Sequence, residues 1–235
     1  MIGVPARETP TLLAGAGLAG LSLVAIGQAA WAPLLHHGPA AIGHGAHADP
    51  TVASAAWLIG WGLMAAAMML PGAVPLMHEI GGAARMGTAR HLRGFAVTGF
   101  VGVWCAVGLL ALGALAATRG LSAAAVLVVA GVYQLSPTKR RALERCRTHG
   151  RLLPLGWASG RDPSGDALRA GVAHGLASVA CCGPLMVATA LVGMGEPVLM
   201  LVAGLAMTAE VATPRGPRVT RPIGVCLLIA AAAAL

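Results

Sequence analysis

The chain has 235 residues, of which 57% are hydrophobic and only 10% are charged, and its mean hydropathy is +0.78. Soluble domains usually carry about 25% charged residues, so this sequence has too few charges to cover the surface of a soluble globular protein. The composition excludes a soluble globular enzyme, a disordered chain and a disulfide-stapled secreted domain. It predicts a single all-α integral membrane domain, a polytopic helical bundle over residues 1–235.

Seven apolar segments are candidates for transmembrane helices. An apolar helix needs about 20 residues to cross the hydrocarbon core of a bilayer. The fourth segment is short and the seventh has only about 14 residues, so six to seven crossings are expected. The predicted crossings are residues 11–31, 52–77, 94–117, 121–136, 168–192, 197–213 and 222–235.

The basic residues predict how these segments are oriented. Cytosolic loops of membrane proteins carry an excess of Lys and Arg. Of the 16 basic residues here, 15 fall on alternate loops, and only Arg119 lies on the other side. This distribution predicts a cytosolic N-terminus. It also explains the net charge of +8 by contact with the lipid bilayer and its anionic head groups, so no nucleic-acid partner is predicted.

Two of the predicted crossings, the second and the fifth, carry soft metal ligands at helical spacing. Thioether and thiolate sulfur suit Cu(I), and at 1.5 Å rise per residue both groups lie near the middle of the membrane. They form one site if the two helices touch. The alternative is hydrophobic packing, because Met and buried Cys fill cores. The candidate metal ligands are Met64, Met68, Met69, His174, Cys181, Cys182 and Met186.

Histidines crowd the predicted outer loop that follows the first crossing. The loop contains His36, His37, His44 and His47. Neutral imidazoles favour Cu(II), Zn(II) or Ni(II), so this cluster is a candidate for metal capture outside the membrane. The spacing matches no structural zinc pattern, and a polar loop that is merely rich in histidine is the alternative.

Two further residues have side chains that carry chemistry. Glu210 lies in the inner part of the sixth crossing, where an ionisable group is costly and is a functional candidate. It either takes part in proton coupling or pairs with a cytosolic base such as Arg215. Cys146 lies among bases in the long cytosolic connection, residues 137–167, where we expect a reactive thiol.

Four blocks of residues, spread from residue 57 to about residue 215, form a combined pattern. They are Trp61-x2-Met64-x3-Met68-Met69-x-Pro71; Tyr133-Gln134-Leu135-x-Pro137-x-Lys139-x3-Leu143-x2-Cys146-Arg147; His174-Gly175 with Cys181-Cys182 and Met186; and Glu210. The pattern resembles the bacterial family of predicted metal-binding integral membrane proteins, a domain of unknown function. The resemblance implies a multi-pass protein of the bacterial inner membrane and no established activity. Where relatives often have cysteine, this chain has Ala142 and Ser178.

The sequence therefore predicts an inner-membrane protein that binds or translocates a soft transition metal, with copper as the best candidate. The alternative is a non-catalytic membrane subunit whose Gly- and Ala-rich helices dock onto a larger complex, through a membrane protein partner or a second copy of the chain. A third hypothesis is a membrane oxidoreductase with a bound metal or haem. His174 is the only histidine deep in a predicted helix, so a bis-His haem is not expected. No catalytic residue is predicted.

Overall fold

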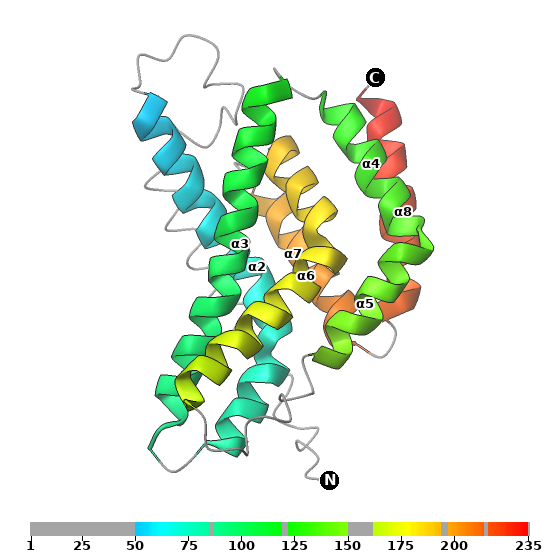
Figure 1. Ribbon diagram of the computed structural model, residues 1–235. Coiled ribbons are helices and arrows are strands. Elements are labelled where there is room, and N and C mark those ends of the chain that lie inside the picture. The colour runs from blue at the N-terminus through cyan, green and yellow to red at the C-terminus, as the bar shows by residue number, and fades with distance from the viewer. Residues whose placement is uncertain are drawn as a thin grey trace.

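The computed structural model describes residues 50–84, 87–118, 122–149, 162–193, 197–213 and 216–234 (Figure 1). Within these ranges every regular element is an α-helix. The predicted first crossing, residues 11–31, and the outer histidine cluster lie outside the described residues. The helices are α2 (Pro50–Ala83), α3 (Ala89–Thr118), α4 (Ala123–Leu135), α5 (Pro137–His149), α6 (Pro163–Gly193), α7 (Pro197–Ala212) and α8 (Gly216–Ala233).

The other six predicted crossings each coincide with a helix. Three helices are long and apolar enough to cross a membrane, over Trp57–Ala83, Ala89–Ala114 and Pro163–Ala190. Helices α4 and α7 are apolar but shorter. With 13 residues, α4 extends about 20 Å at 1.5 Å per residue, which is less than the roughly 30 Å of a hydrocarbon core. The prediction of seven crossings stays a prediction.

Helix α5 is an element that the sequence analysis did not predict, because it lies in the basic connection that was read as a loop. Its buried residues, Lys139, Ala142, Leu143 and Cys146, recur at intervals of three and four, so they share one helical face. Most of its charged residues lie on the opposite, exposed face. The helix is therefore amphipathic and lies with its buried face on the bundle.

Ser136 separates α4 from α5 and sets the start of α5. It precedes Pro137, and a residue before proline avoids the helical conformation; its ψ angle is 153°. Its hydroxyl oxygen then accepts the backbone N–H of Lys139 at 3.1 Å, as an N-capping residue does. The break therefore places Lys139 in the first turn of α5, facing the bundle.

Helix α6 is the centre of the bundle and packs against α2, α3, α4, α5 and α7. In Figure 1 it crosses α3 closely, while α4 and α8 form a neighbouring pair. The crossing of α3 and α6 depends on glycine, because a methyl group on Gly171 would overlap the carbonyl oxygen of Ala96. Small residues of this kind let helix backbones approach closely where lipid gives no hydrophobic drive between helices.

Candidate metal centre

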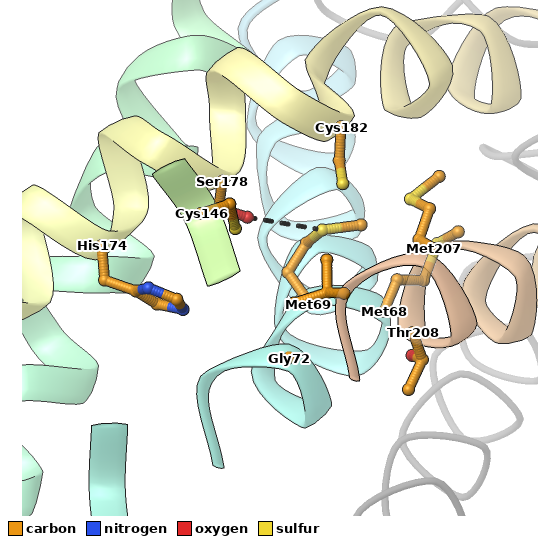
Figure 2. A pocket seen from close by; sticks show the side chains of 10 residues that line it. Met68, Met69, Gly72, Cys146, His174, Ser178, Cys182, Met207 and Thr208 are labelled. Carbon is orange, nitrogen blue, oxygen red and sulfur yellow. Dashed lines mark hydrogen bonds between the residues drawn. The ribbon is translucent and has the colours of Figure 1, made fainter. Parts of the chain in front are cut away.

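A small cavity lies where α2, α5, α6 and α7 converge (Figure 2). It has room for about one water molecule, and therefore for a single ion and not for an organic ligand. Five sulfur atoms line it, and the histidine ring lies apart from most of them at the left of Figure 2. The side chains that carry these donor atoms are Met68, Met69, Cys146, Cys182, Met207 and His174.

Helices α2 and α6 touch at this cavity, as a single shared site requires. The hydroxyl group of Ser178 on α6 points toward the sulfur of Met69 on α2, with 3.8 Å between Oγ and Sδ. Both side chains are about 95% buried. Of the predicted ligands, Met68, Met69, His174 and Cys182 are brought together here.

Three predicted ligands are placed elsewhere. Met64 and Met186 are fully buried in the same hydrophobic core but do not line the cavity. Cys181 is also buried and lies next to the cavity residue Cys182, with its own side chain outside the lining. The helical pattern of the sequence gave these residues a shared depth in the membrane, but it did not show which of them face the junction with α7.

Two cavity residues, Cys146 and Met207, were not among the predicted ligands. Cys146 was expected to be a reactive thiol facing the cytosol. It is instead 1% exposed, because the buried face of α5 places it against α6. A signal for it was present in the spacing of Lys139, Leu143 and Cys146 along one helical face. Met207 stands one turn before Glu210 on α7 and had no stronger signal than any other apolar residue.

Three buried thiols lie in or beside the cavity, and two of them are in contact. The Sγ atoms of Cys181 and Cys182 are 2.9 Å apart. Cys146, from the neighbouring helix α5, lines the same cavity as Cys182. All three cysteines are free thiols and are buried.

Beside these thiols lies a buried ion pair that joins α4, α5 and α7. Lys139 Nζ is 2.7 Å from Glu210 Oε2, and both side chains are completely buried. Gln134 donates a hydrogen bond to the other carboxylate oxygen of Glu210. The carboxylate of Glu210, at hydrogen-bonding distance, offsets the cost of burying the ammonium group of Lys139. Glu210 thus pairs with a base of the long basic connection, although the base is Lys139 and not Arg215.

A proline in α6 explains part of this arrangement. Pro184 has no N–H, so the carbonyl oxygen of Ala180, one turn earlier, loses its helical partner. The hydroxyl group of Tyr133 on α4 donates to that oxygen. The next carbonyl, that of Cys181, accepts a hydrogen bond from Lys139 Nζ at 2.8 Å. These two hydrogen bonds therefore join α4 and α5 to the segment of α6 that carries the two cysteines.

The donor atoms of the cavity fit a soft ion. Within the described ranges, no three His, Cys, Asp or Glu side chains come together in a way that could hold a metal ion. The lining is instead rich in methionine, with the thioethers of Met68, Met69 and Met207 beside two thiols. Thioethers and thiolates select Cu(I), whereas Mg²⁺ and Ca²⁺ require oxygen ligands.

Comparison with known proteins agrees with this chemistry. No curated protein and no solved structure matches the chain. A family model described as "PpoB2: Copper chaperone" matches residues 58–234, a range that includes every residue lining the cavity. Since the match covers most of the sequence, the chain belongs to the PpoB2 copper chaperone family.

Proposed function

We propose that this protein is a membrane-embedded copper chaperone that holds one Cu(I) ion in the cavity between α2, α5, α6 and α7. The observation that carries the proposal is the cavity itself, which has room for about one ion and is lined by two thiols and three thioethers. Neutral thioether ligands bind Cu(I) without adding charge to an apolar interior. The family match supports the choice of copper.

The outer surface of the bundle supports a location in the bilayer of the bacterial inner membrane. Large apolar side chains stand more than half exposed, among them Leu110 at 74%, Val129 at 64% and Ile229 at 64%. A soluble protein rarely exposes so much apolar surface. In the orientation that the basic residues predict, α5 lies at the cytosolic face, with Arg140 and Arg141 exposed toward the head groups.

Within this proposal the residues have distinct roles. Cys182, Met69 and Met207 are the ligands, since they come from three different helices and their sulfur atoms line the same small space. His174 stacks on Phe100 with ring centroids 5.6 Å apart, which holds the imidazole at the edge of the cavity. We assign Glu210 a structural role, because its carboxylate is engaged by Lys139 and Gln134.

The proposal is tested by titrating the anaerobically purified full-length protein with Cu(I) against a chromophoric Cu(I) chelator. We expect one Cu(I) per chain. Substituting Met207→Leu or Cys182→Ser should weaken binding at least about tenfold, because even the loss of groups behind the ligands costs roughly 10–100-fold in metal affinity.

Met64→Leu and Met186→Leu are the matched controls, since both methionines are buried in the same core without lining the cavity. Their Cu(I) affinity should equal that of the parent protein. Equal loss of affinity in all four variants would show that the cavity is not the site. Absence of bound copper together with a stoichiometric membrane partner would support a docking subunit instead.

A further inference from the structure

Helix α5 closes one side of the cavity with a single side chain. Among the described residues that line the cavity, Cys146 comes from α5, whereas α2, α6 and α7 contribute three each. Helix α6, in contrast, packs against α2, α3, α4, α5 and α7. The outer face of α5 carries exposed charged residues, Arg140, Arg141, Glu144 and Arg145. Of the walls of the cavity, α5 is therefore the one suited to moving into water.

The start of α5 has the geometry of a hinge. Ser136 lies between the last residue of α4 and the first residue of α5, and its ψ angle of 153° is extended. Dihedral changes at such an element-terminal residue can reorient a helix that itself stays intact. At 1.5 Å rise per residue, Cys146 lies about 15 Å along α5 from this point. A rotation at Ser136 therefore moves Cys146 much farther than it moves the first turn of α5.

The far end of α5 is held by Arg147, the residue next to Cys146. Its Nη1 atom donates hydrogen bonds to the carbonyl oxygens of Glu210, at 3.0 Å, and Thr213, at 2.6 Å, where α7 ends. The carbonyl of Glu210 has no helical donor four residues later, because residue 214 is a proline. Gly216 leaves room for the guanidinium group, since a methyl group there would lie 2.7 Å from Nη1. The sequence around this turn thus fits the Arg147 side chain.

The polar contacts that hold α5 in place are reversible. Arg147 is partly exposed, so water can replace its two carbonyl partners when the side chain leaves. Lys139 also holds α5, through Glu210 and the carbonyl oxygen of Cys181. That buried pair adds little net stability, because separation of α5 would return both charges to water. Helix α5 can therefore open without leaving a buried charge unpaired.

We propose that α5 is a lid over the cavity, hinged at Ser136 and latched by Arg147, and that Cu(I) enters and leaves through its opening. When Arg147 releases the end of α7, Cys146 swings out of the lining, and the space between α2, α6 and α7 opens to water. The inference rests on the proposed function for the identity of the ion. The movement of α5 is a separate claim, because it is measured at Cys146 without any metal.

The first test needs no copper. The full-length protein carries Cys105→Ser and Cys226→Ser, which removes the two exposed thiols, and is treated with a water-soluble maleimide. We expect Cys146 to be alkylated at least about tenfold faster in Arg147→Ala, because the loss of a hydrogen bond to a charged group shifts an equilibrium by about that factor. Arg141→Ala is the matched control, since it removes the same charge from the exposed face of the same helix. Peptide mass maps give the rate at each cysteine.

The second test measures how quickly the loaded protein transfers Cu(I) to an excess of chelator. Arg147→Ala should transfer its ion at least about tenfold faster than Arg141→Ala, with the same equilibrium affinity in both variants. The affinity stays the same because the latch holds the loaded and the empty lid alike, and the closed form remains the major one. A variant that was merely damaged would lose affinity instead.

The outcomes separate the lid from the copper site. Faster alkylation and faster release at unchanged affinity support both. Faster alkylation of Cys146 in a protein that binds no copper supports the lid and overturns the proposed function. Copper binding with an unchanged rate of alkylation or of release in Arg147→Ala overturns the lid and leaves the site intact, and a loss of affinity also overturns the lid.

The parent protein decides if Arg147→Ala fails to fold. Opening of the lid exposes Cys146, while Cys181 and Cys182 stay on α6. Cys146 should therefore be alkylated before the other two buried thiols. Equal rates at all three thiols would show that the whole bundle opens and would overturn the lid.

Discussion

At the scale of single residues, Lys139 and Glu210 show how strongly one pair can determine an interface. A buried ion pair adds little net stability, because desolvation of the two charges offsets their attraction. Removing one partner is different, since the other charge then stays buried without compensation. Here the pair lies at the meeting point of α5 and α7, and Gln134 and the Cys181 carbonyl satisfy the remaining hydrogen bonds. Its main effect is to specify how α5 docks.

Glu210→Gln should therefore lower the free energy of unfolding by about 3–5 kcal/mol, the usual cost of leaving a buried charge unpaired. The measurement is chemical unfolding in detergent, followed by circular dichroism. The double variant Lys139→Met with Glu210→Leu removes both charges and should recover most of the loss. A single variant as stable as the parent protein would contradict the buried pair.

Ser178 offers a gain-of-function test at the same scale. It lines the cavity, and its hydroxyl group is a hard donor that points at a thioether. Ser178→Cys adds a third thiol to the lining, so we expect at least about tenfold tighter Cu(I) binding by chelator competition, in line with the effect of a single donor on metal affinity. Ser178→Ala should bring no such gain, and a gain in both variants would remove the explanation by ligand count.

At the scale of elements, the sequence allowed the apolar helices to be predicted and missed the one that completes the site. Helices α2, α3 and α6 contain long runs of apolar residues, and a run of about 20 such residues directly predicts a helix that can cross a bilayer. Helix α5 has the opposite composition, and its periodicity of buried residues was obscured by the basic residues between them. Cys146 was therefore placed in a loop. Met207 lines the cavity and Met64 does not, because α7 is one of the helices that meet there. The pattern of a single helix does not show which helices it meets.

The crossing of α3 and α6 gives a prediction that belongs to these elements. In Gly171→Ala the new methyl group meets the backbone carbonyl oxygen of Ala96, which cannot move cheaply. We expect a loss of about 1–3 kcal/mol in the free energy of unfolding, as for other overpacked contacts. Gly102→Ala on α3 is the matched control, because its added methyl group would meet open space. Equal effects of the two changes would contradict the close crossing.

At the scale of the whole molecule, the proposed orientation places the copper cavity near α5 and thus toward the cytosolic side. The exposed bases of α5 lie on the surface opposite to its contacts with α6 and α7, and the proposed orientation turns them toward the cytosol. A chaperone with this orientation would pass copper to a cytosolic or membrane-bound acceptor through the α5 face.

This orientation predicts a difference between two exposed positions, Ser122 before α4 and Thr138 at the start of α5. Each is changed to Cys in a protein carrying Cys105→Ser and Cys226→Ser, which removes the two exposed thiols. A membrane-impermeant maleimide added to intact spheroplasts should label Ser122→Cys at once. Thr138→Cys should react only after the membrane is broken. The reverse pattern would invert the topology, and equal labelling would argue against a spanning bundle.

The burial of Lys139 offers a way to detect movement of α5 away from the bundle. It is the single lysine of the sequence, since every other basic side chain that is not histidine is an arginine. Arginine does not react with amine reagents under mild conditions. The only side-chain amine that can react is therefore that of Lys139, which is buried between α5 and the rest of the bundle. The rate of acylation of that amine, followed by mass spectrometry, would report how often α5 separates from the bundle. The native chain thus carries its own reporter of the movement of α5, without any introduced label.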